Sequence, residues 1–425
     1  MQPIVGVVAD DLTGGMETAA MLVALGVGVG FATRPDSLRG MPVAPAMVLA
    51  QKTRVIPAAE AVAKSEAAAH ALLELGVRQL FFKYCATFDS TDRGNIGPVA
   101  ERLLDMTGAS FTAYCPSGPV NGRTVYSGHL FVGTELVSDS PKRFDPLTPM
   151  TDPNLVRVLQ RQTVGRVGLL PHASVRQGGE KLRLLVEELA GQGVRHFVAD
   201  AIYDEDLAAI AALTVDWRVM TGNAPIMQHY PNLWRARGWL SGEGERRPLP
   251  AVAGPGVVLA GSCADRTLEQ LRAFEAARPV LWLDVASAEG VGQALAEALH
   301  WTLARLGEGP VAIATSASPD DVRRAQDRFG RDGAARFAED VLGALAVSLR
   351  DAGVRRFLVA GGETSGTVVE RLGIDRLHIG AYQGPGVARA VTEDADPVAL
   401  CLKSGKLGPV GMFLPTLESM KHPEV

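Results

Sequence analysis

The sequence predicts an α/β protein with two domains, each a mostly parallel sheet flanked by helices, and a ligand cleft between them. Apolar strand-like runs alternate with amphipathic helical stretches, and this alternation is typical of parallel α/β layering. Residues 241–256, within LSGEGERRPLPAVAGPG, are dense in Gly, Pro and charge and interrupt the alternation. A second alternating series follows. We therefore expect an N-terminal domain over residues 1–240, a linker over 241–256 and a C-terminal domain over 257–425.

The elements of the first domain follow one another as strand and helix. Strands are expected at residues 3–9, 27–33, 46–51, 79–85, 111–115, 166–170 and 195–203, and helices at 16–26, 58–76 and 178–193. In the second domain, strands are expected at 257–261, 279–285, 310–316 and 356–362, and helices at 264–277, 290–307 and 334–353. The C-terminal runs 376–382, 386–391 and 397–403 are expected to be short strands. The sequence shows no internal repeat.

Composition narrows the classes of protein. The 425 residues are 47% hydrophobic and 21% charged, with a net charge of −5 and no dense Lys/Arg run, which disfavours nucleic acid and membrane surfaces as partners. The first residues lack the features of a signal peptide or a membrane span, so we expect a cytoplasmic location. The four cysteines are widely spaced and none forms a CxxC pair, so we expect reduced thiols.

The first strand ends in VADDLTGG, which places Asp10 and Asp11 at its carboxyl end. In open α/β sheets this edge is where ligands bind. Paired carboxylates there could accept hydrogen bonds from sugar hydroxyls, hold a cation or act as a general base. The alternative is that one aspartate only caps the following helix.

Cations end two further strands. Arg54 follows the strand at 46–51, and Lys83 ends the strand at 79–85. An acid substrate needs such groups, and arginine can bind a carboxylate through two hydrogen bonds. Each could instead be a surface charge.

The segment FFKYCATFDSTDRGNIGP, residues 81–98, is the most informative in the chain. A helix is expected to begin near Pro98, so the polar residues between strand and helix would face a bound ligand. The group suits a small polyhydroxy acid, although a solvated loop with local turns is the alternative. Its candidate ligand-binding residues are Lys83, Asp89, Ser90, Arg93 and Asn95.

Two long loops are expected in this domain. Residues 115–133, CPSGPVNGRTVYSGHLFVG, are too long and too rich in glycine for an economical connection, and Asn121 and Arg123 could complete an acid-binding pocket. Residues 138–152 could cover that pocket or be a structural excursion.

The second domain has three glycine-bearing corners after strands. Glycines let the backbone approach an anion, and a helix N-terminus supplies oriented amides, so the corner in VAGGETSG reads as a phosphate cradle. Any one corner could be an ordinary tight turn, whereas three together indicate a nucleotide. The candidate residues are Ser262, Gly361, Gly362, Glu363, Thr364, Ser365, Lys403, Ser404 and Gly405. The motifs GxxxxGK[ST], HExxH and GxSxG are absent, and the run LGVGVGFA has the reverse order of a dinucleotide-binding turn.

Taken in order, VADDLTGG, KYCATFDSTDRGNIGPV, GPVNGRTV, LTPMTD, AGSC, AGGETSG and LKSGKLG resemble the four-carbon acid sugar kinase family over nearly the whole chain, and within it the 3-oxo-tetronate kinases. The resemblance implies an acid-sugar domain followed by an ATP domain. It also implies transfer of the γ-phosphoryl group of ATP to the terminal C4 hydroxyl of the acid. The chain departs from the family pattern at Leu12, Thr53, Ala86 and Lys406. Lys406 would add positive charge if it faced the nucleotide and would do nothing if it faced solvent.

Phosphoryl transfer depends on alignment and charge neutralisation, so Mg²⁺ and the cradle amides should contribute most. Asp89, Asp10 and Asp11 are the candidates to orient or deprotonate the acceptor hydroxyl, with Asp89 favoured; the metal ligands stay open. A homodimer is expected for an enzyme of this size. The alternatives are a D-threonate or D-erythronate kinase and a non-catalytic sensor that binds an acid sugar and a nucleotide.

Overall fold

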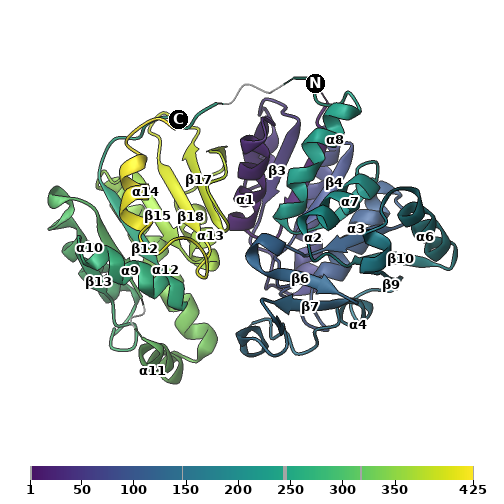
Figure 1. Cartoon of the computed structure of the whole chain (residues 1–425). Coiled ribbons are helices and arrows are strands. Elements are labelled where there is room, and N and C mark those ends of the chain that lie inside the picture. The colour runs from purple at the N-terminus through teal and green to yellow at the C-terminus, as the bar shows by residue number, and fades with distance from the viewer. Residues whose placement is uncertain (1, 146, 243–246, 316–317, 425) are drawn as a thin grey trace. The chain divides into compact units, whose positions relative to one another are not determined.

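The structure, a computed structural model, describes residues 2–145, 147–242, 247–315 and 318–424. The chain divides into two compact units, Met1–Arg246 and Arg247–Val425 (Figure 1). The division falls inside the expected linker, of which residues 243–246 lie outside the described residues. The α/β fold with mostly parallel sheets flanked by helices is confirmed.

The N-terminal unit is built on an eight-stranded sheet in the order β2-β3-β1-β4-β11-β5-β10-β9, with every pair parallel. Its strands are β1 (Val5–Ala9), β2 (Val29–Ala32), β3 (Ala46–Ala50), β4 (Gln79–Lys83), β5 (Thr112–Cys115), β9 (Arg166–Leu170), β10 (Val194–Ala199) and β11 (Val219–Gly222). The central strands β1 and β3 are continuous apolar runs, β4 is apolar between Gln79 and Lys83, and every residue of the three is buried, as expected for a sheet covered on both faces.

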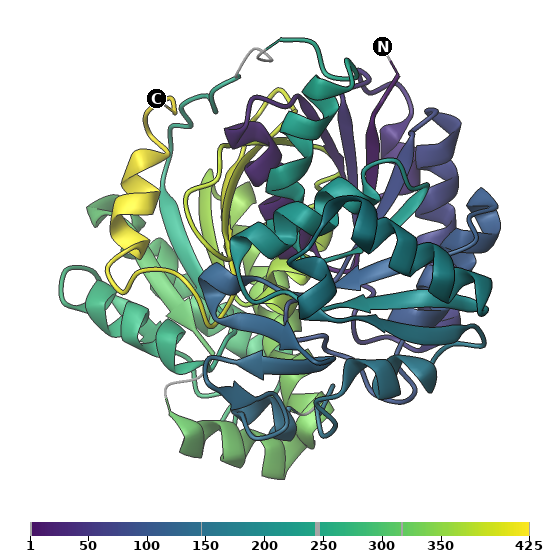
Figure 2. The same cartoon turned by 45° about the vertical axis from the view of Figure 1, so that its right-hand side comes forward.

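Helices cover both faces of this sheet (Figure 2). They are α1 (Leu12–Ala24), α2 (Ala58–Glu74), α3 (Ile96–Thr107), α4 (Leu155–Gln160), α5 (His172–Val175), α6 (Gly179–Gly191), α7 (Asp204–Thr214) and α8 (Tyr230–Ala236), with 3-10 turns η1 (Pro35–Leu38), η2 (Pro119–Asn121), η3 (Pro141–Phe144) and η4 (Ala224–His229). The contacts α2·α3 and α3·α4 define one layer, and α1·η4, α7·η4 and α6·α7 define the other. Helix α3 places Pro98 in its first turn, as predicted.

The stretch after β5 differs from the expected loop. Residues 123–136 form an antiparallel sheet of three short strands, β6 (Arg123–Tyr126), β7 (His129–Val132) and β8 (Glu135–Leu136). Asp200 at the end of β10 anchors its first turn by accepting hydrogen bonds from the amides of Ser127 (2.7 Å) and Gly128 (2.8 Å). The glycine-rich sequence therefore serves a hairpin turn, and only the residues on either side are irregular.

The C-terminal unit has a seven-stranded sheet in the order β13-β14-β12-β15-β18-β17-β16. Its strands are β12 (Gly256–Ala260), β13 (Val280–Trp282), β14 (Val311–Ala314), β15 (Arg356–Ala360), β16 (Leu377–Ile379), β17 (Val387–Thr392) and β18 (Ala399–Lys403). Strands β12 to β15 and β18 are parallel, whereas β16 and β17 are antiparallel, so the three short C-terminal strands are confirmed.

Helices also cover both faces of this second sheet. They are α9 (Asp265–Glu275), α10 (Val291–Leu303), α11 (Pro319–Phe329), α12 (Arg331–Asp351), α13 (Gly362–Arg371) and α14 (Phe413–Ser419), with the turn η5 (Leu306–Glu308). The contacts α10·α12 and α12·α13 form one layer, and α14·α9 belongs to the other. Helix α11 was not predicted.

The two sheets begin with the same winding order, although the sequence shows no repeat. The order β2-β3-β1-β4 in the first corresponds to β13-β14-β12-β15 in the second. In each, the chain first moves to one side of its opening strand and then crosses to the other. The crevices outside the carboxyl ends of β1 and β4, and of β12 and β15, are therefore the switch points at which such sheets bind ligands.

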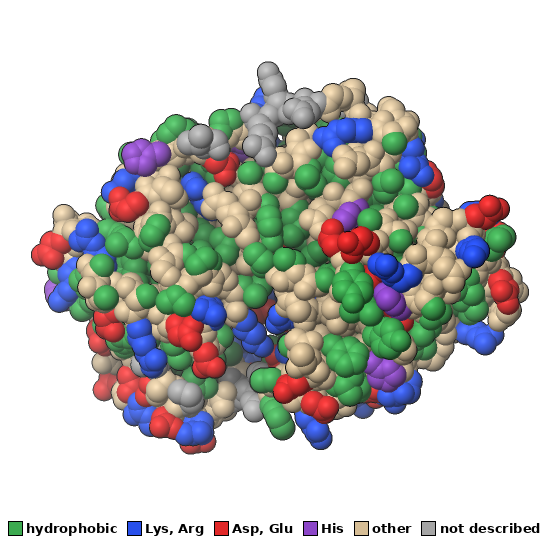
Figure 3. All heavy atoms as spheres, viewed as in Figure 1, with side chains coloured by type: hydrophobic (Ala, Val, Ile, Leu, Met, Phe, Trp, Pro, Cys, Tyr) green, Lys and Arg blue, Asp and Glu red, His purple; other side chains and the backbone are tan. Residues whose placement is uncertain are grey.

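The surface mixes charges of both signs. On the face in Figure 3, Lys and Arg side chains are interspersed with Asp and Glu. None of the helices in the described part of the chain has the length and apolar character needed to cross a membrane.

Candidate active site

The carboxyl ends of β1, β3 and β4 are tied together by backbone hydrogen bonds. The amide of Asp10 donates to the carbonyl of Lys83 at 3.0 Å, and the carbonyl of Asp10 accepts from the amides of Thr53 at 2.9 Å and Arg54 at 3.2 Å. Arg54 and Lys83, which follow Asp10 by 44 and 73 positions in the chain, thus meet it at one switch point.

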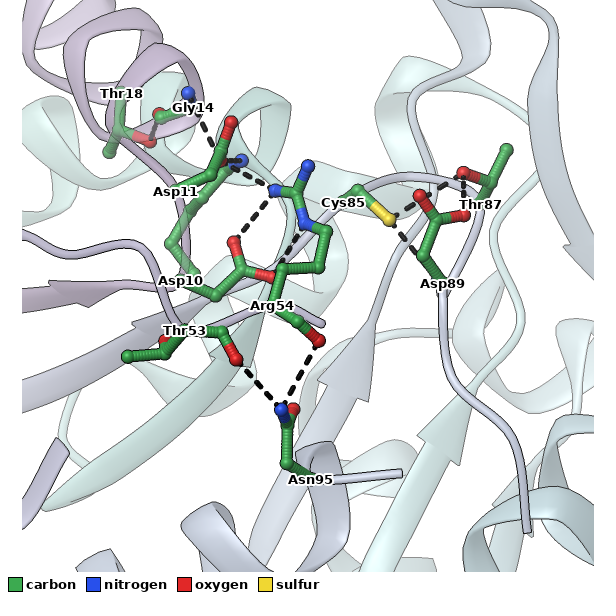
Figure 4. Close-up of polar contacts among 11 residues, drawn as sticks. Asp10, Asp11, Gly14, Thr18, Thr53, Arg54, Cys85, Thr87, Asp89 and Asn95 are labelled. Atoms are coloured by element: carbon green, nitrogen blue, oxygen red, sulfur yellow. Dashed lines mark hydrogen bonds and ion pairs between the residues drawn. The ribbon is translucent and has the colours of Figure 1, made fainter. Parts of the chain in front are cut away.

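Four of the predicted side chains form a charge cluster there (Figure 4). Arg54 donates to both oxygens of Asp10, from Nε at 2.8 Å and from Nη2 at 2.7 Å, and its Nη2 also lies 2.5 Å from Oδ1 of Asp11. The ammonium of Lys83 lies 3.2 Å from the same Asp11 oxygen. Two cations and two carboxylates therefore neutralise one another in a site that is almost closed to water.

Burial and pairing act differently on the two aspartates. Burial raises the pKa of Asp10 above its ordinary value, and Arg54 only partly offsets this effect. Burial would also raise the pKa of Asp11, but Arg54 and Lys83 more than offset it and hold the pKa well below the usual range. Burial would lower the pKa of Arg54, yet the two aspartates raise it well above the usual value. At neutral pH the guanidinium stays charged, and Asp11 is a very weak base.

Asp11 is also the N-cap of α1, because its Oδ1 accepts from the amide of Gly14 at 3.1 Å. The capping role expected as the alternative for one of the two aspartates is therefore present, together with the ion pairs. Gly14 is needed for this arrangement, since a methyl group on its Cα would lie 1.6 Å from Nζ of Lys83.

Asp89 lies on the other side of Arg54 (Figure 4). Phe88 directs the chain there from the left-handed region, with φ of 50°, and is held by full burial and an edge contact with Tyr84. Oδ1 of Asp89 accepts from the hydroxyl of Thr87 at 2.6 Å, and its amide donates to Sγ of Cys85 at 3.2 Å. Residues that packing holds in a strained backbone conformation, as Phe88 is here, cluster at functional sites.

Lys142 was missed by the sequence reasoning, which expected residues 138–152 either to cover the pocket or to be a structural excursion. Its ammonium lies 2.6 Å from Oδ1 of Asp89 and 2.9 Å from Oδ2 of Asp145, and the residue is buried. Burial alone would raise the pKa of Asp89, but Lys142 and then Arg54 lower it overall. Cys85, which lies beside Asp89, is not ionised, because burial raises its pKa to about 11. A lysine inside a loop with alternating charges gave no signal of its burial.

Three further candidate residues from segment 81–98 do not join the charge cluster. The amide nitrogen of Asn95 donates to the carbonyls of Thr53 at 2.8 Å and Arg54 at 3.2 Å, so it fixes the loop that carries Arg54. The hydroxyl of Ser90 is buried and accepts from Gln162 at 2.8 Å. Arg93 is exposed on the turn before α3. These positions indicate that Asn95 and Ser90 shape the site, and their contact with a substrate stays a prediction.

Arg123 is the cation whose surroundings fit a substrate carboxylate best. Its Nη1 donates to the carbonyl of Asn121, and among the described residues it forms no ion pair. Partial burial lowers its pKa, and the carboxylate of Asp89 acts in the opposite direction. Arg54, in contrast, already has two carboxylate partners. An added carboxylate would therefore find its uncommitted cation at Arg123.

The glycine corners of the C-terminal unit converge. They follow β12, β15 and β18, which are adjacent parallel strands, so all three lie on one sheet edge. A methyl on Gly261 would lie 2.1 Å from Oγ1 of Thr364, and a methyl on Gly405 would lie 2.1 Å from Oγ of Ser262. Gly361 adopts a φ of 127°, which favours glycine. Only glycines let these three corners pack against one another.

Helix α13 begins at this junction, and its N-cap Gly361 has no side chain to satisfy the first amides. The first amides of the helix and its dipole make the junction an anion site of the phosphate-binding type. Ser365 adds a fully buried hydroxyl that has no hydrogen-bond partner among the described residues. Gly362 and Glu363 lie in the same first turn and are partly exposed.

Lys403 stabilises the third glycine corner, the one that follows β18. It is fully buried, and its Nζ donates to Oγ1 of Thr267 at 3.0 Å and to the carbonyl of Gly405 at 3.2 Å. Burial lowers its pKa to about 8. Ser404, next in the chain, donates its amide to the carbonyl of Gly386 at 2.8 Å. Lys406 is exposed on the loop after β18, and its contribution to nucleotide binding stays a prediction.

Comparisons with known proteins likewise connect the N-terminal unit with a sugar and the C-terminal unit with a nucleotide. The family model described as the sugar-binding N-terminal domain matches residues 5–230, and the one described as the nucleotide-binding C-terminal domain matches residues 257–413. The chain belongs to the four-carbon acid sugar kinase family. It is therefore an α/β enzyme of the kinase class that uses ATP and a small-molecule substrate.

Named relatives extend over the whole chain. The chain is 43% identical to a 3-oxo-tetronate kinase of Burkholderia multivorans over 99% of its own length and 98% of the relative's. It is 45% identical to a 3-oxo-tetronate kinase of Cupriavidus necator, over 97% and 96%. Among solved structures, a Salmonella typhimurium LT2 protein named as a candidate tRNA synthase has a TM-score of 0.84 at 35% identity, over 97% of this chain and 98% of that one. A Haemophilus influenzae protein has a TM-score of 0.74 at 34% identity, over 98% and 100%.

Proposed function

We propose that the chain is an ATP-dependent 3-oxo-tetronate kinase that phosphorylates the C4 hydroxyl of its acid. The observation that supports this most is the identity of 43–45% with relatives of that name over 96–99% of the chain. The two switch points, one with paired charges and one with glycine corners, fit an acid and a nucleotide respectively.

The acid would bind at the N-terminal switch point with its carboxylate on Arg123. The neutralised cluster of Asp10, Asp11, Arg54 and Lys83 would then form a rigid polar wall beside it, because its cations and carboxylates already satisfy one another. Such a wall can donate hydrogen bonds to substrate hydroxyls and accept hydrogen bonds from them without moving.

Asp89 is the carboxylate we assign to the acceptor hydroxyl. The raised pKa favours Asp10 as the stronger base, but both of its oxygens are bound to Arg54. Asp89 has its hydrogen-bond donors, Lys142 and Thr87, on one oxygen, and among the described residues none donates to the other, which would accept from the substrate. Because the transition state of phosphoryl transfer is loose, orientation of the hydroxyl outweighs basicity.

The nucleotide would bind at the C-terminal switch point, with its phosphates on the amides of the Gly361 corner and at Ser262 and Gly405. No group of three side chains able to hold a metal occurs among the described residues. This fits Mg²⁺, which usually binds through phosphates and one or two carboxylates, and Glu363 in the first turn of α13 is the carboxylate that would serve. The bound ion would neutralise charge on the transferred group.

The assay is ADP release measured with a panel of acids: 3-oxo-tetronate, D-threonate and D-erythronate. Turnover of 3-oxo-tetronate with much lower kcat/KM for the other two supports the proposal, and the reverse order would make the chain a threonate or erythronate kinase. Binding of acid and ATP without turnover of any acid would identify a sensor.

The role of Asp89 is tested with Asp89→Asn and a matched control, Asp92→Asn. Asp92 belongs to the same segment but pairs with Arg161 at the surface, where such pairs contribute little. We expect kcat to fall about 100-fold or more for the first variant, with KM for ATP nearly unchanged, and no effect for the second. Near-normal kcat for Asp89→Asn would refute the assignment.

The cytoplasmic location and the homodimer expected from the sequence stay predictions. Light scattering of the purified chain would test the oligomeric state.

A further inference from the structure

The turn that carries Asp89 is closed by hydrogen bonds to Cys85. This cysteine is the second residue after β4, and its carbonyl accepts from the amide of Phe88 at 3.2 Å. Its sulfur accepts from the amide of Asp89, also at 3.2 Å. Because Phe88 adopts a φ of 50°, the chain reverses sharply and returns Asp89 to the residue at which the turn began.

The side chain of Thr87 connects the two ends of this turn (Figure 4). Its hydroxyl oxygen lies 2.6 Å from Oδ1 of Asp89 and 3.5 Å from the sulfur of Cys85. An ionised carboxylate only accepts hydrogen bonds, so the hydroxyl of Thr87 donates to Asp89. The single proton of that hydroxyl is then in use, and the thiol of Cys85 is left as the donor to the oxygen of Thr87.

Both ends of this chain of hydrogen bonds have the protonation state that it requires. Burial raises the pKa of Cys85 to about 11, so the thiol keeps the proton that it donates. Burial alone would raise the pKa of Asp89, but Lys142 and then Arg54 hold it below the ordinary value, so the carboxylate is ionised at neutral pH. One arrangement of protons therefore satisfies all three side chains, from thiol to hydroxyl to carboxylate.

Lys142 alone would not fix the orientation of the Asp89 carboxylate. Its ammonium lies 2.6 Å from the same Oδ1, but an ammonium is a compact charge with donors that rotate. A carboxylate also turns over a broad range about its last side-chain bond. The hydroxyl of Thr87 is itself held by the thiol, so it fixes Oδ1 in direction and leaves Oδ2, to which no described residue donates, on the other side.

We propose that Cys85 and Thr87 are positioning residues, which orient the Asp89 carboxylate so that Oδ2 receives the hydrogen bond of the acceptor hydroxyl. This inference rests on the proposed function, in which Asp89 orients that hydroxyl. Phosphoryl transfer depends more on alignment than on basicity, so a misdirected carboxylate should lower kcat without changing how ATP binds. Neither Cys85 nor Thr87 was a candidate in the sequence analysis.

The main test is Thr87→Val, which keeps the shape of the side chain and removes the hydroxyl. Loss of a hydrogen bond to a charged group should lower kcat about tenfold or more, with KM for ATP unchanged. Thr87→Ser restores the hydroxyl and should recover most of the lost kcat. Thr107→Val is the matched control, because the hydroxyl of Thr107 donates to the carbonyl of Leu103 in its own helix at 2.8 Å, and it should leave kcat unchanged.

A double-mutant cycle separates positioning from a general effect on the loop. In the Asp89→Asn enzyme the hydroxyl of Thr87 has no carboxylate to orient, so adding Thr87→Val should change the residual kcat by less than about twofold. A merely structural role would lower kcat by the same factor in both backgrounds, and that result would overturn the inference. Failure of Thr87→Ser to recover activity would overturn it as well.

Cys85→Ala tests the other end of the chain. It removes the donor to Thr87 and the acceptor for the amide of Asp89, so kcat should fall in the same way, and this variant replaces Thr87→Val if the latter does not fold in thermal unfolding. A folded Thr87→Val enzyme with kcat within about twofold of wild type, beside an inactive Asp89→Asn enzyme, would overturn this inference alone. Near-normal kcat for Asp89→Asn, or a wild-type enzyme that turns over none of the acids, would overturn the proposed function and this inference with it.

Discussion

Replacing Gly14 with alanine should destabilise the N-terminal unit and lower turnover. The new methyl group would lie 1.6 Å from Nζ of Lys83 and 2.4 Å from Oδ1 of Asp11, so the buried ammonium must leave its partner. Breaking a buried ion pair costs about 3–5 kcal/mol. Alanine would recover up to about 1 kcal/mol of helix propensity, which leaves a net loss of roughly 2–4 kcal/mol. For a unit of this size that corresponds to a fall in Tm of about 5–15 °C.

Gly191→Ala is the matched control. Gly191 is exposed at the last position of α6, and a methyl group there meets nothing within 4 Å. The same substitution should therefore stabilise the same unit by about 0.5–1 kcal/mol and leave kcat/KM unchanged. Thermal unfolding followed by tryptophan fluorescence, together with the ADP assay, measures both effects. If Gly14→Ala unfolds within 1 °C of wild type and retains full turnover, the close approach of Lys83 does not hold the site together.

Two further perturbations test single lysines. Lys142→Met keeps the length of the side chain but removes the ammonium that faces Asp89, so we expect the pKa of Asp89 to rise and kcat to fall about tenfold. Arg143→Met, which changes an exposed neighbour, should have no effect. Equal kcat in the two variants would show that Lys142 does not belong to the site. Burial lowers the pKa of Lys403 to about 8, so the side chain loses its positive charge as the pH passes from 7 to 9, and KM for ATP should rise over that range. Lys406→Met should keep this pH profile. A flat profile in the wild type would contradict the role of the buried charge. The folded pKa lies below the ordinary value of 10.5, so the unfolded chain binds more protons between pH 8 and 10.5, and the contribution of Lys403 to the free energy of unfolding should increase over that range.

Much of the fold follows from the alternation of strand-like and helical runs. Buried parallel strands need continuous apolar stretches, and these are visible in the sequence without any knowledge of their neighbours. Short or polar elements are not. Helix α11 contains PDDVRRAQDRF, with too few apolar residues to show a period, and β6 to β8 have only two to four residues each between glycine turns.

The site was predictable where strand ends carry charge. Asp10, Arg54 and Lys83 each follow a strong strand, and the parallel sheet brings such ends together. The distances that make them partners depend on strand order, which alternation alone does not define. Sequence also gave no reason to expect that Asn95 would turn its amide toward the backbone of another loop.

Lys142 shows what else the sequence does not reveal. It belongs to a loop with charges of both signs, so its burial against Asp89 depends on how the loop folds back. It cannot be recognised as a site residue until the neighbouring strands are known.

The most direct test is a crystal structure of the protein soaked with a non-hydrolysable ATP analogue and the acid substrate. We expect the triphosphate on the amides of Gly361 to Ser365, beside Ser262 and Gly405, and the acid among Arg123, Asp89 and the charge cluster of the N-terminal sheet. A triphosphate bound at Asp10 and Lys83, with no density at the three glycine corners, would contradict the assignment of the two switch points.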